Sequence, residues 1–81
     1  MLLDKIIEAN PDDTYLKADG FDKAIIGVDT ASGRLIYSVK KAIEVLHEEM
    51  SLEDAREYFS FNVEPAYMGE MTPIWCDDDY E

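Results

Sequence analysis

The residues of this chain best suited to catalysis or metal binding are one histidine and one cysteine. His47 stands between Glu44 and Glu48, so a single helix would offer imidazole and carboxylate groups at spacings of one and three. A zinc site needs about three protein ligands, and Cys76, the other soft ligand, lies far along the chain. The sequence therefore favours a solvated histidine over a metal ligand or a Cys–His pair. We expect no catalytic residue, no cofactor and no bound metal.

Three aspartates, Asp19, Asp22 and Asp29, surround the first strand of a predicted hairpin. Paired carboxylates perform acid–base chemistry when burial raises the pKa of one of them. Aspartate is also a common turn residue, as in the pair Asp19-Gly20, and the turn interpretation is favoured. The nearby loop 30–34 lacks the glycine pattern of a phosphate-binding loop. An enzyme or small-ligand protein that uses Asp19, Asp29 and Tyr67 is the last-ranked alternative.

Charge is distributed unevenly along the chain. The net charge is -12, from nineteen acidic and seven basic residues. Residues 1–41 carry seven acids and six bases, a net of -1, whereas residues 42–81 carry twelve acids and one base, a net of -11. A field of this sign repels nucleic acids and anionic membranes and attracts basic protein surfaces. Direct nucleic-acid binding and membrane binding are therefore not expected.

Eight acidic residues of the second half form the predicted partner-binding set. Glu48 and Glu49 stand at a predicted helix C-terminus, where the helix dipole disfavours them, and Glu53 repels Glu57 at a four-residue spacing. Such placements indicate selection either for solubility or for an electric field. The set comprises Glu44, Glu48, Glu49, Glu53, Asp54, Glu57, Glu64 and Glu70.

Length and composition predict one small domain. Eighty-one residues with an apolar fraction of 47% fit a single globular core, which we place at residues 1–76, with an acidic tail over 77–81. One cysteine excludes an internal disulfide and agrees with a reducing compartment. The run MLLDKIIEAN has no long apolar stretch and carries Asp4, Lys5 and Glu8. We therefore expect neither a signal peptide nor a membrane span, and a cytoplasmic location.

The elements that position these residues begin with a short helix and a hairpin. Residues 2–7 place two pairs of leucine and isoleucine on one side of a helix. Residues 15–18 are interpreted as a short strand. Residues 23–29 predict a strand with Ala24, Ile26 and Val28 on one face, and residues 34–38 predict a second with Leu35 and Tyr37 on one face. The loop 30–33 contains Gly33 and has hairpin length.

Two consecutive helices follow the hairpin. Ser38 is suited to cap the first, whose apolar residues recur in steps of three and four: Val39, Ala42, Ile43, Leu46 and Met50. Ser51 is suited to cap the second, with an inward face of Leu52, Ala55, Phe59 and Val63 and an end at Glu64-Pro65.

A last strand is predicted over residues 72–76, at a sheet edge because Pro73 cannot donate a hydrogen bond. Tyr67 and Trp75 are expected to pack inward, although residues 66–71 also have the composition of an interaction loop. The fold class is α+β: a small β-hairpin-containing sheet packed against two consecutive helices, with a short N-terminal helix.

Four runs, DGFDKAIIGVD, LIYSVKKAIEVL, MSLEDAREYFSFNV and AYMGEMTPIW, carry a resemblance to small proteins encoded by phages and prophages. Members of that set share a "GFDxAxIGV" hairpin, a helix ending in "EYFxFNV", and a "GAYxGExTPIF" segment. The resemblance covers residues 19–75, with Pro65 in place of glycine and Trp75 in place of phenylalanine. It implies a phage or prophage origin and an α/β fold. No activity is known for the set, so it implies no catalytic residues.

The leading hypothesis is a small acidic phage-type accessory protein, not an enzyme, that acts in the host cytoplasm. It would bind a basic surface of a host or defence protein, as an inhibitor or nucleic-acid mimic. Everything in this hypothesis requires the carboxylates of the two helices to share one face. The first alternative is a small homo-oligomeric structural protein, such as a homodimer, whose edge strand or apolar loop completes its core.

Overall fold

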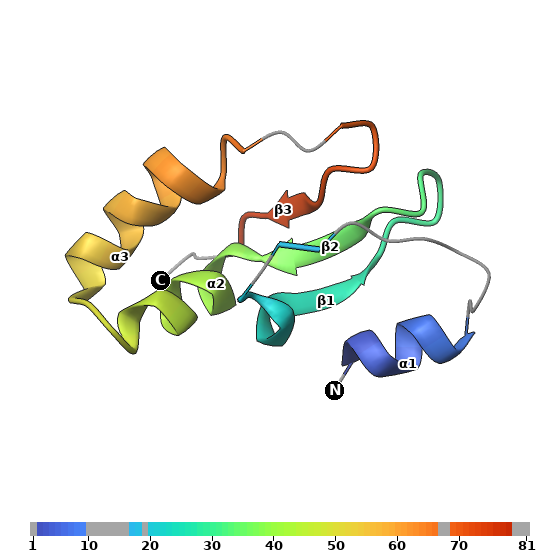
Figure 1. Cartoon of the computed structure of the whole chain (residues 1–81), viewed down its shortest axis with the longest axis horizontal. Helices are drawn as coiled ribbons and strands as arrows, with labels where there is room; N and C mark the ends of the chain where they lie inside the picture. The colour runs from blue at the N-terminus through green and yellow to red at the C-terminus, as the bar shows by residue number, and fades with distance from the viewer. Residues whose placement is uncertain (1, 10–16, 19, 67–68, 79–81) are drawn as a thin grey trace.

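A three-stranded sheet with two consecutive helices packed against it forms the centre of the fold (Figure 1). The computed structural model describes residues 2–9, 17–18, 20–66 and 69–78. The strands are β1 (Ile25–Val28), β2 (Leu35–Ser38) and β3 (Ile74–Cys76), in the order β1-β2-β3. A short helix, α1 (Leu2–Ala9), contacts β1. The predicted α+β class and the short N-terminal helix are confirmed.

The predicted hairpin is formed by β1 and β2, which pair antiparallel with Val28 opposite Leu35. The peptide N–H of Asp29 donates to the carbonyl oxygen of Arg34, and that of Gly33 donates to the carbonyl of Asp29, each at 2.8 Å. Gly33 has a φ of +75°, a conformation that glycine adopts without the steric penalty of a side chain. Leu35 and Tyr37 are both buried, as predicted.

The first strand starts later than predicted, and its predicted face of Ala24, Ile26 and Val28 is wrong at Ile26. Residues 22–24 form a 3-10 turn, η1 (Asp22–Ala24), so the strand begins at Ile25 rather than Lys23. Ile25 is buried and Ile26 is exposed, while Ala24 is buried from the turn and not from the strand. The pairing register also shifts between Ile25 and Gly27, as in a β-bulge. Because this bulge interrupts the alternation of side chains, Ile25 and Val28 both pack on the core while Ile26 is exposed.

Both helices begin at the predicted serine caps. Helix α2 (Val39–His47) starts after Ser38, whose Oγ accepts a hydrogen bond from the Lys41 N–H at 3.0 Å. Helix α3 (Leu52–Tyr58) starts after Ser51, whose Oγ accepts from the Asp54 N–H at 3.1 Å. These bonds satisfy peptide donors that have no partner within the first helical turn.

The buried faces of the helices agree with the prediction, with one exception. Val39, Ala42 and Ile43 of α2 are buried, as are Ala55 of α3 and Phe59 just after it. The exception is Leu52, the first residue of α3, which was expected to face inward and is exposed.

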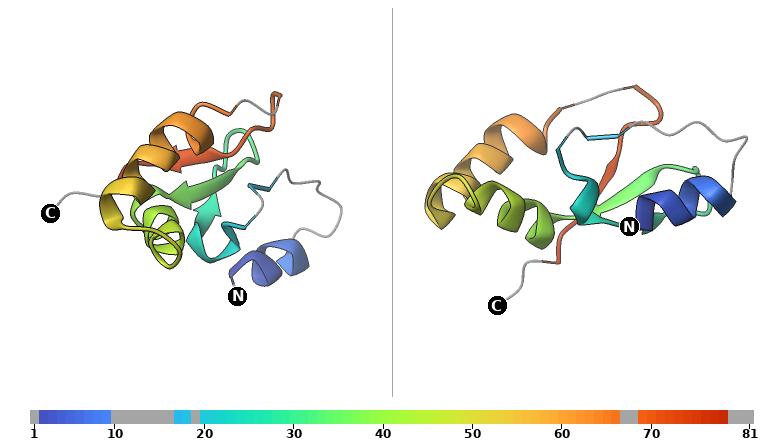
Figure 2. Two further views of the ribbon diagram at one scale, coloured as in Figure 1. Left: turned by 60° about the vertical axis from the view of Figure 1, so that its left-hand side comes forward. Right: turned by 60° about the horizontal axis from the view of Figure 1, so that its bottom comes forward.

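Strand β3 returns to the sheet after both helices and pairs parallel to β2, with Ile36 opposite Ile74 and Tyr37 opposite Trp75. A parallel neighbour requires a crossover connection, which residues 39–73 supply. The two further views show α2 and α3 together at one end of the molecule, with β3 beside β2 (Figure 2). The predicted edge strand is thus confirmed over residues 74–76, directly after Pro73. Of the strand expected over 15–18, residues 15 and 16 lie outside the described residues, and 17–18 have no regular structure.

An aromatic cluster occupies the core between the sheet and the helices. The ring of Trp75 lies 5.0 Å from those of Tyr37 and Phe59 and 5.9 Å from that of Phe21, measured between centroids. The contacts with Phe21 and Phe59 are edge-to-face, a favourable arrangement of aromatic quadrupoles. The hydroxyl of Tyr37 accepts a hydrogen bond from the Ala18 N–H at 2.9 Å. Trp75 thus packs inward as predicted, whereas Tyr67 lies outside the described residues.

The chain after β3 is joined to the start of α2 by Asp78. Its Oδ2 accepts a hydrogen bond from the Ser38 hydroxyl at 2.6 Å, and its Oδ1 accepts from the Lys40 N–H at 3.0 Å. The Ser38 hydrogen bond is the largest of the causes that hold the pKa of Asp78 below its ordinary value of 3.8. Asp78 therefore acts as a second cap on α2, at the end where the helix dipole favours a negative charge.

Candidate protein-binding face

The eight acidic residues predicted to bind a partner are all exposed. Glu44, Glu48 and Glu49 belong to α2 and the turn after it, and Glu53, Asp54 and Glu57 belong to α3. Glu64 and Glu70 follow in the chain that leads to β3. Exposure of the whole set is consistent with a surface role.

Four of these carboxylates gather around one aromatic ring. Glu48 and Glu49 line a groove with Tyr58, Val45 and Val63, among others. Asp54 and Glu57 line the neighbouring groove, again with Tyr58, and with Phe61, Met50 and Asn62. Tyr58 therefore separates the two grooves. We call the six residues Glu48, Glu49, Asp54, Glu57, Tyr58 and Phe61 the acidic–aromatic face.

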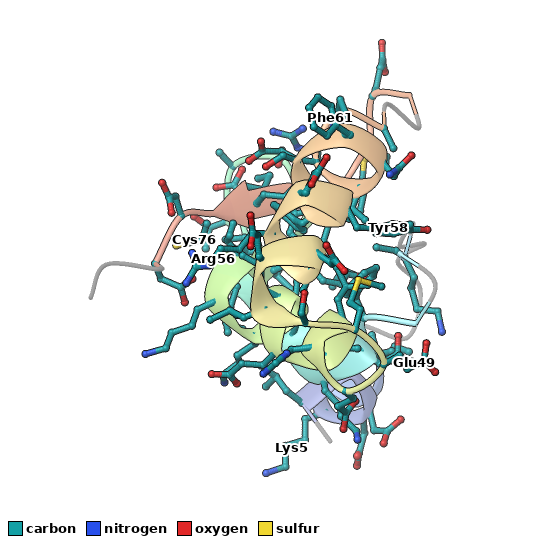
Figure 3. All side chains as sticks on the ribbon, turned by 90° about the vertical axis from the view of Figure 1, so that its left-hand side faces the viewer. Lys5, Glu49, Arg56, Tyr58, Phe61 and Cys76 are labelled. Atoms are coloured by element: carbon teal, nitrogen blue, oxygen red, sulfur yellow. The ribbon has the colours of Figure 1, made fainter. Side chains whose placement is uncertain are left out.

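The structure does not bring all eight predicted residues to this face. Glu64 lines a different depression, with Arg56 and Asp77. Figure 3 shows Arg56 and Cys76 on the side of α3 opposite Tyr58 and Glu49. Glu44 and Glu53 line neither of the two grooves, and Glu70 lies in the turn before β3. The predicted set therefore divides into a cluster of four and four others.

Phe61 and Tyr58 were not predicted as site residues. Phe61 is 72% exposed and Tyr58 is 45% exposed, both unusual for large aromatic side chains. The sequence signal is the run Tyr58-Phe59-Ser60-Phe61, because one helix face cannot bury three aromatic residues so closely spaced. Phe59 is the one that enters the core, at 2% exposure.

A π-helical turn, η2 (Phe59–Val63), continues α3 and determines the position of Phe61. The Glu64 N–H donates to the Phe59 carbonyl at 2.9 Å, a bond that spans five residues instead of four. The wider turn keeps Phe59 against Trp75 and Val63 half-buried, while Phe61 stays in solvent. π-Helical turns are rare and occur often at functional sites.

The electrostatic surroundings of the face are mostly negative. Arg56 is the one basic residue of residues 42–81, and it lies on the other side of α3. Lys23 borders Glu48 in a shallow depression and reduces the field at that corner of the face. Lys17 Nζ lies 3.8 Å from Asp22 Oδ2, and neither residue belongs to the face. The carboxylates on the Phe61 side, Asp54 and Glu57, have no basic residue in the lining of their groove.

The residues considered for metal or nucleophilic chemistry do not converge. His47 Nδ1 lies 2.8 Å from the Met50 carbonyl oxygen, so its ring is tied to the turn between the helices. Cys76 is exposed on the edge strand β3. Within the described part of the chain, no three His, Cys, Asp or Glu residues are grouped to hold a metal ion.

Asp29 has the geometry of a turn residue. Its Oδ2 accepts hydrogen bonds from the Ser32 N–H at 3.0 Å and the Ser32 hydroxyl at 2.6 Å. The hydroxyl bond is the largest cause that lowers the pKa of Asp29, the direction opposite to that of a general acid. Asp19 and Tyr67, named with it for the small-ligand alternative, lie outside the described residues.

Comparisons with known proteins give no further guidance. No family model, no curated protein and no solved structure matches the chain. Among the described residues, no helix has the length and apolar character needed to cross a bilayer.

Proposed function

We propose that this chain is a binding protein that captures a basic protein surface through the acidic–aromatic face. The observation that supports this most strongly is the gathering of four carboxylates around exposed Tyr58 and Phe61, with Arg56 on the other side of the helix. Carboxylates supply long-range attraction and orientation. Aromatic side chains supply the area that makes a contact stable once formed, and tyrosine is enriched at such sites.

The partner class that best fits this face is a nucleic-acid-binding protein, with the chain acting as a mimic of its ligand. Duplex DNA carries one charge per about 1.7 Å, hence about 23 over the 39 Å length of this molecule. The net -11 of residues 42–81 is spread over more than one face, and the four carboxylates of the acidic–aromatic face match the charge of about 7 Å of duplex. The resemblance of residues 19–75 to phage-encoded proteins makes a host or defence protein in the host cytoplasm the natural target.

A matched pair of variants tests whether the face, and not the net charge, binds the partner. The face variant carries Glu48→Gln, Glu49→Gln, Asp54→Asn and Glu57→Gln. The control carries Glu8→Gln, Glu44→Gln, Glu64→Gln and Glu70→Gln, all exposed in the structure. Each loses four negative charges, from -12 to -8. Immobilised protein is incubated with bacterial lysate at low and high salt, and bound proteins are eluted with duplex DNA.

We expect the wild type and the control to retain proteins that high salt or DNA releases, because exposed charge contacts are screened. The face variant should retain far less. Equal loss in both variants would mean that net charge alone matters, and capture that ignores salt would exclude the carboxylates as the contact.

A homo-oligomer is a second candidate, favoured by exposed apolar side chains in two neighbouring elements. Leu2 and Ile7 of α1 and Ile26 of β1 are between 38% and 46% exposed. A second copy would cover them if α1 and β1 formed an interface. Sedimentation at several concentrations distinguishes the two candidates, because self-association follows mass action. The small-ligand alternative has the least support, given the turn geometry of Asp29.

A further inference from the structure

We propose that the groove beside Tyr58 and Phe61 receives an arginine side chain of the basic partner, an inference that rests on the proposed function. This groove has a volume of about 410 Å³ and is lined by Met50, Asp54, Glu57, Tyr58, Phe61 and Asn62. It combines the thioether and aromatic side chains of an apolar surface with two carboxylates. The chemistry of this lining determines which occupant fits.

The apolar part of the groove results from the π-helical turn that follows α3. Phe61 cannot reach the core because Phe59 already occupies the position against Trp75. The π-helical turn then leaves the Phe61 ring 72% exposed at the end of α3. Tyr58, three residues earlier, is on the neighbouring part of the helix surface. The two rings thus form a surface on which a flat group can stack.

The carboxylates decide the charge of the occupant. Asp54 precedes Tyr58 by four residues and Glu57 precedes Phe61 by four, so each acid neighbours a ring on the helix surface. An apolar segment would desolvate these carboxylates without giving them a partner, which is unfavourable. An acidic segment would be repelled by them. The occupant therefore carries positive charge.

Arginine satisfies both parts of the groove better than lysine. A guanidinium group is planar and weakly hydrated, so its face stacks on an aromatic ring while its edge donates paired hydrogen bonds to a carboxylate. A lysine ammonium is compact and strongly hydrated, and it gains less from an aromatic surface. The other groove, with Glu48 and Glu49, lacks Phe61 and is expected to attract either cation.

The test uses two peptides of equal length and charge, one with arginines and one with lysines, separated by glycines. Their affinities are measured at one fixed salt concentration by titration calorimetry. We expect the wild type to bind the arginine peptide about three- to ten-fold more tightly. Phe61→Ser should weaken binding of the arginine peptide more than binding of the lysine peptide, so that the two affinities become equal. Leu52→Ser, which removes another exposed apolar side chain of α3, should keep the preference.

The outcomes separate this inference from the proposed function. Equal affinity of the wild type for both peptides would overturn the arginine site and leave the basic-surface proposal standing. Retention of the preference in Phe61→Ser would also overturn it. Failure of the wild type to bind either peptide would count against both. Circular dichroism and Trp75 fluorescence verify that each variant is folded.

Discussion

The hydrogen bonds that join Ser38, Asp78 and the start of α2 lead to a prediction that two substitutions can test. Ser38 is fully buried, and its hydroxyl accepts from the Lys41 N–H while donating to Asp78. Asp78 also accepts from the Lys40 N–H. Ser38→Ala therefore removes one cap and weakens a second, whereas Asp78→Ala removes only the second.

The expected magnitudes follow from these contacts. Loss of a serine N-cap costs about 1 kcal/mol, and a hydrogen bond to a charged group contributes about 1.5–3 kcal/mol when it is well shielded. Asp78 is exposed, so solvent screening reduces its contribution, and we expect Asp78→Ala to cost about 1 kcal/mol. Ser38→Ala should cost about 2 kcal/mol. The double variant should lose about 0.5–1 kcal/mol less unfolding free energy than the two single variants added together. The reason is that the bond between the two side chains can be lost only once.

The assay is urea unfolding followed by the fluorescence of Trp75, the one tryptophan of the chain, which packs against three core rings. A domain of this size is expected to unfold in a two-state manner, which permits free energies to be compared. Glu70→Ala is the control, since it removes one exposed negative charge elsewhere. An Asp78→Ala variant no less stable than Glu70→Ala would refute the second cap. Costs of Ser38→Ala and Asp78→Ala that add within about 0.3 kcal/mol would refute the bond between the two side chains.

Two further predictions are tested by the same urea-unfolding measurement. The folded pKa of Asp78 lies below its ordinary value of 3.8, so its stabilisation is complete above that pH and lost as pH falls through the folded pKa. Asp78→Ala should therefore lose less stability than the wild type on acidification below about pH 4, and parallel curves would refute this. Phe59→Ala should cost about 3–5 kcal/mol and Phe61→Ala less than about 0.5 kcal/mol, and similar costs would contradict their assigned environments.

Local signals in the sequence were sufficient for much of the fold. Ser38 and Ser51 precede apolar residues at helical spacing, and each caps the helix that follows it. The loop 30–33 supplies the glycine that the hairpin requires. These features depend on neighbours within a few residues, so they can be recognised without knowledge of the rest of the chain.

The features that were missed depend on distant contacts. Ile26 was wrongly grouped with Ala24 and Val28, because a bulge in the pairing with β2 interrupts the alternation of side chains. The parallel pairing of β3, and the bonds from Asp78 to Ser38, join residues about forty positions apart, which no local pattern reports.

The candidate site was predicted in part. Helical spacing placed Asp54 and Glu57 on the same helix as Tyr58, but the division of the eight acids into two groups depends on how α3 packs against α2 and the sheet. The run Tyr58-Phe59-Ser60-Phe61 indicates that some aromatic ring stays exposed, but the exposure of Phe61 in particular depends on the π-helical turn. The charges of this site can therefore be found in the sequence, whereas the position of its exposed aromatic surface is found only in the structure.

The late position of Trp75 in the chain has a consequence for biosynthesis. Phe21, Tyr37 and Phe59 are all translated before the ring that lies against each of them. A nascent chain that has reached only residue 73 contains the hairpin and both helices, yet its three aromatic rings lack their common neighbour. We therefore expect the emerging polypeptide to stay loosely packed and vulnerable to proteases, and to consolidate in one step when the tryptophan leaves the ribosome.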